Sequence, residues 1–229
     1  MSPTPAARDS HAASPPRVTL PMVGLGLAIV YAPSYLPSLL RLAGGDIPAW
    51  GPAGVLLWNW LAVGLLALHV GALERLDAAS LRLAKPTTKD VEWALYLGGA
   101  ANLWHWGTAA LLPESMTGQA NAGQTTVVAL GPLLALALVL TTSVTEEVLW
   151  RGYVVERLGA WIGPLAAAAA GMTIFALGHL SFFGWTWLLT NLPGAIALYA
   201  LLLWRRNLWS CIICHAVLNM PIVVLTLLR

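Results

Sequence analysis

Charged residues are scarce in this sequence. Asp, Glu, Lys and Arg make up only 10% of its 229 residues, whereas 58% are hydrophobic. An average soluble domain has about 25% charged and about 45–50% apolar residues. Twelve basic and ten acidic residues leave a formal net charge of +2, which is too small for the basic surface of a nucleic-acid-binding protein. The composition therefore predicts a membrane protein whose partner is the lipid bilayer and not nucleic acid.

Cysteine is also scarce, because Cys211 and Cys214 are the only two, so the chain has no disulfide framework. Together with His215 they match the C-x-x-C-H pattern of c-type haem attachment. The match lies inside a long apolar run and not in the exposed segment that haem attachment needs. We therefore interpret both cysteines as small packing residues and expect no haem.

Long apolar runs account for most of the chain. Residues 1–17 are rich in Pro, Ala and Ser and predict a disordered tail. Because about 20 apolar residues make one spanning helix, the remainder predicts an all-α, polytopic transmembrane helical bundle of about seven spans, with six to eight compatible with the pattern. Residues 114–125 are expected to form a polar connector. The predicted spans are residues 18–42, 54–73, 91–112, 126–158, 162–180, 185–204 and 208–228.

Basic residues gather on one side of the predicted membrane. That side contains Arg8, Arg17, Arg75, Arg82, Lys85, Lys89, Arg157, Arg205 and Arg206, and the other side contains Arg41 and Arg229. Short loops rich in Lys and Arg stay in the cytoplasm. This asymmetry predicts a cytoplasmic N-terminus and an external C-terminus, as an odd number of spans requires, in an integral protein of the bacterial cytoplasmic membrane.

Three charged residues, Glu146, Glu147 and Arg151, fall inside the fourth predicted span. Each costs about 2.5–3.5 kcal/mol at the centre of a spanning helix. Glu147 and Arg151 are four residues apart with the acid first, which favours an ion pair on one helical face. Glu146 points about 100° away, so we expect it to stay unpaired and to suit a general base. Alternatively the cluster marks the membrane surface, but the helical pattern continues to Arg157 and places Glu146 about 16 Å deep.

Two residue pairs follow on later spans. Phe175 and His179 are four apart, as are His215 and Asn219, so each pair lies on one helical face. Taken alone, a histidine on an apolar face is more often a core residue or a helix-contact donor than a catalytic group. Counted from the cytoplasmic loops, His215 and Asn219 are predicted about 10 and 16 Å deep, but His179 about 25 Å. His179 then reaches the level of Glu146 only if its span is tilted or starts late.

Three further polar residues fall within predicted spans: His69 and, three residues apart, Asn102 and His105. Polar side chains need a partner inside a membrane. These side chains could line the same cavity or bond across helices, and we favour bonds across helices.

Three motifs occur in order on the fourth, fifth and seventh predicted spans. They are Glu146-Glu147-x-x-x-Arg151-Gly152, Phe175-x-x-x-His179 and His215-x-x-x-Asn219. In residue types, spacing and order they resemble the CAAX-protease and bacteriocin-processing (CPBP) family of intramembrane proteases, of its Rce1-like or Abi type. The resemblance covers about residues 141–221, and the first three spans match only as generic membrane helices. We therefore divide the chain into N-terminal transmembrane helices, residues 18–125, and a catalytic transmembrane core, residues 126–229.

The resemblance implies an intramembrane endopeptidase, similar to a CAAX prenyl protease, that hydrolyses a peptide bond of a membrane-associated protein or peptide. By the same resemblance, Glu146 with His179 would activate a water molecule, and His215 with Asn219 would stabilise the oxyanion. The alternative is a non-proteolytic membrane scaffold or a bacteriocin-immunity protein with the same fold. The other motif residues would complete or support the site: Glu147 as a further catalytic residue, and Arg151 and Phe175 as supporting ones.

The sequence leaves open whether zinc takes part. Glu146, His179 and His215 would make an acceptable ligand set, with water in the fourth position. The chain has no H-E-x-x-H helix, and the same side chains serve equally well in a metal-free, glutamate-based site. We favour the metal-free site and assign no metal ligand.

Overall fold

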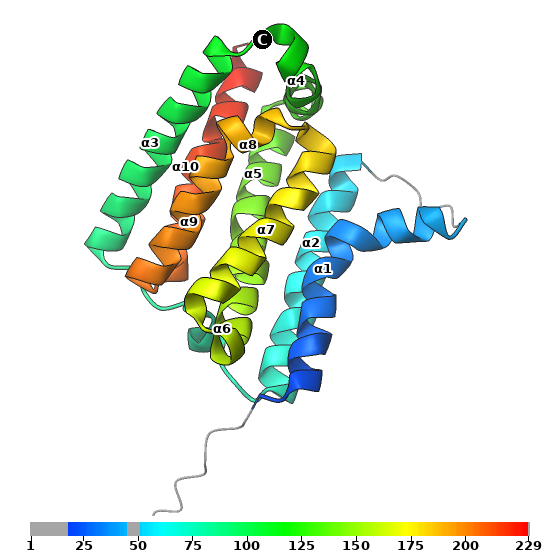
Figure 1. Cartoon of the computed structure of the whole chain (residues 1–229), viewed down its shortest axis with the longest axis vertical. Helices are drawn as coiled ribbons and strands as arrows, with labels where there is room; N and C mark the ends of the chain where they lie inside the picture. Colours follow the sequence, from blue (N-terminus) through cyan, green and yellow to red (C-terminus); the bar gives the residue numbers. More distant parts are fainter. Residues whose placement is uncertain (1–17, 45–50, 229) are drawn as a thin grey trace, which may run out of the picture.

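The computed structural model describes residues 18–44 and 51–228, so the predicted tail of residues 1–17 lies outside the described residues. The described part contains helices and turns but no strand. Its helices pack into a bundle (Figure 1), which confirms the predicted all-α transmembrane class. In chain order they are α1 (Leu20–Leu42), α2 (Gly51–Leu68), the π-helix η1 (His69–Leu73), the 3-10 helix η2 (Ala78–Leu81), α3 (Thr88–Leu111), α4 (Glu114–Val128), α5 (Pro132–Glu146), the π-helix η3 (Glu147–Val155), α6 (Glu156–Ile162), α7 (Pro164–Phe183), α8 (Thr186–Thr190), α9 (Leu192–Arg205) and α10 (Leu208–Leu227).

Apolar helices of spanning length are present in the bundle. Within residues 18–44 and 51–228, three helical stretches are long and apolar enough to cross a membrane: Gly54–Leu73, Pro132–Ile162 and Leu208–Leu227. Large apolar side chains such as Leu133 (84% exposed) and Leu165 (74% exposed) lie on the surface, as expected where a protein faces lipid. The predicted count of seven spans stays a prediction. Shorter apolar helices cover Leu20–Ala32, Pro164–Leu180 and Leu192–Arg205.

The stretch Pro132–Ile162 forms the centre of the bundle. It contains α5, η3 and α6 without a break, and all nine residues of η3 are buried. Helices α1, α2, α7 and α10 all contact η3. A π-helix is rare and frequently occurs at functional sites. The first motif lies where this helix begins, because Glu146 ends α5 and Glu147 opens η3.

Helix α4 corrects the prediction for residues 114–125, which were expected to be a polar connector. It begins after Pro113 and has Glu114 in its first turn, where an acidic side chain is favourable. Figure 1 shows α4 at the end of the bundle where α10 ends. Spanning helices are predicted from apolar runs. Because α4 is polar, its composition does not predict a helix.

Two predicted spans also have different bounds in the structure. The helix expected from residue 126 begins at Pro132, because Gly131 has a φ of 80° and proline favours the first helical position. The span expected over 185–204 is divided into α8 and α9 at Asn191. Both breaks place turns at the same end of the bundle as α4 (Figure 1).

Ion pairs and hydrogen bonds hold the loops at the end of the bundle opposite α4. Glu74 is 1% exposed and accepts hydrogen bonds at 2.8 Å from the hydroxyl of Tyr153 and from Nε of Arg157. Asp90 lies in the first turn of α3 and pairs with Arg205 at 2.8 Å. These contacts tie helices that are distant in sequence and hold the lower part of the central helix in place.

Candidate active site

Glu147 lies in a buried charge cluster. Its side chain is 0% exposed, and its Oε1 atom lies 3.2 Å from Nη1 of Arg151, which confirms the ion pair predicted from the spacing. The same oxygen lies 2.7 Å from Nδ1 of His215 on α10. Because an ionised carboxylate only accepts hydrogen bonds, Nδ1 of His215 is the donor. Glu147 therefore joins the π-helix to α10 through one oxygen atom.

Arg151 is held between two aromatic rings. Its guanidinium carbon lies 4.3 Å from the ring centroid of Phe175 on α7 and 4.4 Å from that of Tyr199 on α9. The Arg151 side chain is 0% exposed, and cation–π contacts are stronger when they are desolvated. The two rings and Glu147 together make a buried positive charge tolerable, and they draw α7 and α9 towards the π-helix.

Glu146 is the accessible carboxylate of the adjacent pair. Its side chain is 20% exposed, and its Oε2 atom lies 4.0 Å from Nε2 of His215, which is too long for a hydrogen bond. No hydrogen bond to the Glu146 carboxylate occurs among residues 18–44 and 51–228. The two ring nitrogens of His215 thus face the two glutamates, one at bonding distance and one farther away. This arrangement agrees with the unpaired Glu146 that the helical spacing predicts.

His179 approaches the same cluster from α7. Its Nδ1 atom lies 2.9 Å from the backbone oxygen of Phe175, so Nδ1–H donates and Nε2 is the acceptor in the neutral ring. The His179 ring packs against Phe175 and Trp187, with centroid distances of 4.2 and 4.8 Å. It is close enough to Glu146 and His215 to interact electrostatically with both. His179 therefore belongs to the cluster.

The sequence predicts a greater depth for His179 unless its span is tilted or starts late. That prediction places the start of its helix at the level of the neighbouring loops. In the structure α6 continues to Ile162 before α7 starts at Pro164. Glu156 lies within 4.0 Å of Arg206 at the α9–α10 turn, so the end of α6 lies about 9 Å beyond that turn. The later start of α7 brings His179 to the level of Glu146.

Asn219 lies one turn beyond His215 on α10 and is partly buried. Its side chain makes no hydrogen bond among the described residues. Its place near the site therefore follows from helical spacing and not from a contact. The other predicted site residues are brought together by contacts or charge interactions: Glu146, Glu147, Arg151, Phe175, His179 and His215.

A zinc ligand cluster is not formed by these side chains. In the described part of the chain, no group of three or more His, Cys, Asp and Glu residues is arranged to hold a metal ion. The set considered from the sequence, Glu146, His179 and His215, is therefore not preformed as a ligand set. The Nδ1 atoms of the two histidines are engaged by Phe175 and Glu147, so only their Nε2 atoms would be open to a ligand.

The haem-like pattern lies in a packed helix interface. Cys211 and Cys214 are both 0% exposed. The Cys211 thiol donates to the backbone oxygen of Leu198 on α9 at 3.5 Å. Both side chains are thus packed between helices, as small apolar residues would be.

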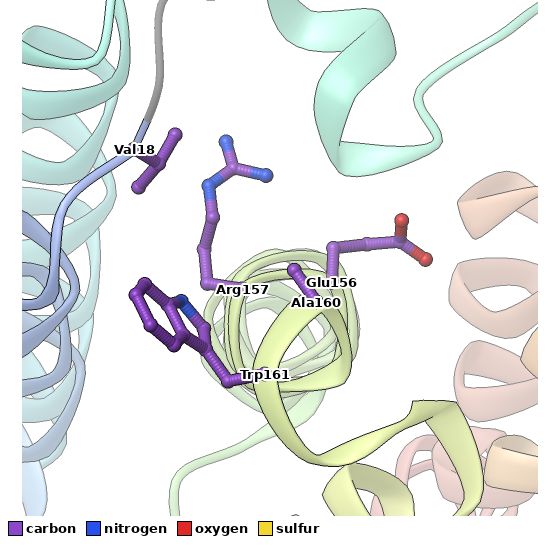
Figure 2. Close-up of a pocket in the computed structure, with 5 residues that line it drawn as sticks. All are labelled: Val18, Glu156, Arg157, Ala160 and Trp161. Carbon is purple, nitrogen blue, oxygen red and sulfur yellow. The ribbon is translucent and has the colours of Figure 1, made fainter.

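A pocket of about 430 Å³ lies beside α6 (Figure 2). Arg157, on its wall, is already engaged because it donates to Glu74 at 2.8 Å and to the backbone oxygen of Ser80 at 3.1 Å. None of the three motifs contributes a residue to this pocket, and we assign it no part in the site. It is lined by Val18, Glu156, Arg157, Ala160 and Trp161.

Tyr199 is the site residue that sequence reasoning missed. Its hydroxyl is buried with no hydrogen-bond partner among the described residues, and its ring covers Arg151. A tyrosine inside an apolar span signals a specific contact, but spacing does not identify the partner. Asn102, in contrast, was expected to bond across helices, and it donates to the backbone oxygen of Val217 at 2.8 Å, which confirms that prediction.

Part of the chain matches the model of a known protein family. Residues 128–221 match the family model described as type II CAAX prenyl endopeptidase, Rce1-like. The match extends from the last residue of α4 to Pro221 in α10 and includes every residue of the cluster. No curated protein and no solved structure gives a significant match.

Proposed function

We propose that this integral membrane protein hydrolyses a peptide bond of a membrane-associated protein or peptide, because residues 128–221 match the family model of Rce1-like type II CAAX prenyl endopeptidases. The observation that carries the proposal is the unequal exposure of two adjacent glutamates. Glu146 is 20% exposed beside His215, whereas Glu147 is 0% exposed and contacts Arg151 and His215 through its Oε1 atom. One carboxylate is thus available for chemistry while the other holds the site together.

Glu146 acts as the general base. It takes a proton from a water molecule, and the hydroxide attacks the carbonyl carbon of the scissile bond while the C=O electron pair moves to oxygen. His179 orients the water, because its Nε2 atom is the free acceptor of the ring. A positioned general base accelerates such a step by roughly 10²–10⁴-fold.

His215 and Asn219 stabilise the oxyanion that forms. In its protonated form His215 donates from Nε2, while Nδ1 stays bonded to Glu147 at 2.7 Å. Asn219 donates from its amide nitrogen, and preorganised donors of this kind stabilise developing charge. The oxyanion electron pair then re-forms the C=O bond as the C–N bond breaks, and Glu146 returns its proton to the leaving nitrogen, which yields a carboxylic acid and an amine.

Arg151 and Phe175 hold the proposed catalytic side chains in place. Arg151 pairs with Glu147, and Phe175 contacts both the Arg151 guanidinium and the His179 ring. The site as proposed uses no metal ion. The basic loops orient the protein with its N-terminus in the cytoplasm, and the bacterial cytoplasmic membrane is the proposed location.

Peptide cleavage in detergent tests the proposal. The purified protein is incubated with quenched-fluorescent peptides that carry a farnesylated C-terminal cysteine, and with the same peptides lacking the farnesyl group. We expect cleavage of at least one series, with heavy oxygen from labelled water in the new carboxylate. Intact peptides in both series would instead favour the alternative, a non-proteolytic scaffold or bacteriocin-immunity protein, whose function does not need Glu146.

A further inference from the structure

Pro221 interrupts the hydrogen bonding of α10. It is the proline inside this helix, and a proline has no backbone N–H to donate to the carbonyl four residues earlier. That carbonyl belongs to Val217. In a membrane there is no water to take the place of the missing donor, so an unpaired carbonyl is costly.

Asn102 of α3 supplies the missing donor. Its side-chain nitrogen donates to the backbone oxygen of Val217 at 2.8 Å. Gly98, one turn earlier on α3, permits the close approach: a Cβ atom at Gly98 would lie 2.8 Å from the Val217 side chain and 3.1 Å from the Cys214 backbone oxygen. Gly98 and Asn102 therefore face one stretch of α10, and the amide of Asn102 reaches the carbonyl that Pro221 leaves free.

This stretch of α10 carries the proposed oxyanion donors. His215 is anchored separately, because its Nδ1 atom is bonded to Glu147. Asn219 lies between Val217 and Pro221, in the turn that lacks its own backbone hydrogen bond. From this juxtaposition we propose that Asn102 is a positioning residue, which fixes the Asn219 turn through the Val217 carbonyl. The inference rests on the proposed function, since it assigns Asn219 a role in turnover.

A double-mutant cycle between Asn102 and Pro221 tests the proposal. Asn102→Leu removes the side-chain donor, whereas Pro221→Ala restores a backbone N–H that reaches the Val217 carbonyl. With a cleaved probe peptide, we expect Asn102→Leu to lower kcat about ten-fold with KM changed less than about two-fold, because a misplaced donor is felt in the transition state. In the Pro221→Ala background the same substitution should lower kcat less than about two-fold.

The melting temperature in detergent gives a second readout of the same four proteins. Asn102→Leu should lower it in the native background and have a smaller effect beside Pro221→Ala, because the carbonyl then keeps a partner. Thr108→Val is the matched control on α3. The Thr108 hydroxyl donates to the carbonyls of Trp104 and His105 on its own helix, so its effect should be the same in both backgrounds.

The outcomes separate this inference from the proposed function. Equal effects of Asn102→Leu in both backgrounds, on kcat and on melting temperature, would overturn the inference. If Asn102→Leu keeps the native kcat while Glu146→Gln is inactive, the role of Asn102 is refuted and the protease proposal stands. Turnover retained in Glu146→Gln would refute the proposed role of the site, and the melting cycle alone would then decide whether Asn102 holds Val217. If Pro221→Ala is itself inactive, the melting cycle likewise decides.

Discussion

Removing the Arg151 guanidinium would leave the Glu147 carboxylate buried without its cation. The two side chains are both 0% exposed and lie 3.2 Å apart. Removing one partner of a buried ion pair costs roughly 3–5 kcal/mol. Losing the cation–π contacts at 4.3 and 4.4 Å adds about 1 kcal/mol or more, part of which methionine recovers by packing. We therefore expect Arg151→Met to lower the free energy of unfolding by about 4 kcal/mol.

Thermal unfolding in detergent, followed by tryptophan fluorescence, measures this loss. At about 2–4 °C per kcal/mol for a chain of this length, the melting temperature should fall by roughly 10 °C. Arg82→Met is the matched control, because Arg82 pairs with Glu156 at 2.8 Å with its side chain 32% exposed. A partly exposed pair contributes about 1 kcal/mol or less, so the control should fall by at most about 4 °C.

The double variant Arg151→Met with Glu147→Gln completes this experiment. It removes the orphaned charge, so it should regain at least half of the lost stability, because much of the loss comes from the unpaired carboxylate. An Arg151→Met protein as stable as the Arg82→Met control would refute the reasoning. So would a double variant that is less stable than Arg151→Met alone.

Three smaller predictions concern the loops and the metal question. Tyr153→Phe deletes the hydroxyl that donates to Glu74 at 2.8 Å; it should cost about 1–2 kcal/mol of stability in the same melting assay, and an unchanged midpoint would contradict it. Burial raises the pKa of Asp90, yet hydrogen bonds from Thr87 and Arg205 outweigh it and hold the pKa below its usual value. Asp90 lies just before the predicted span 91–112. Its contribution to the stability of the fold is therefore present above the unfolded pKa of about 3.9 and is lost as the pH falls through the folded pKa. In Asp90→Asn the melting temperature should therefore fall less as the pH is lowered. A pH dependence equal to that of the native protein would contradict this prediction. A strong chelator should leave peptide turnover within about two-fold, whereas a loss restored by added zinc would establish a metal site.

The sequence predicted those contacts of the site that depend only on spacing along one helix. The Glu147–Arg151 pair follows from residues four apart with the acid first, and the same rotation leaves Glu146 on a different face. The helical class follows from the apolar runs. Such predictions succeed because residues four apart lie on one side of a helix whatever its neighbours are, and the pair forms here even though η3 is a π-helix.

Contacts between helices were not predictable in the same way. The bond from His215 to Glu147 and the position of Tyr199 over Arg151 depend on which helices pack together. The level of His179 depends on where α6 ends, and a difference of a few residues shifts a side chain by about 1.5 Å each. Helix α4 was missed because its polar residues resemble those of a loop.

The central claim is that Glu146 is the base that activates water, and turnover by Glu146→Gln tests it most directly. Glu92→Gln is the matched control, because Glu92 is an exposed glutamate on α3. We predict that Glu146→Gln lowers kcat for the cleaved peptide by at least about 10²-fold, with a melting temperature close to that of the native protein, while Glu92→Gln stays fully active. Turnover by a folded Glu146→Gln protein that matches the Glu92→Gln control would contradict the account.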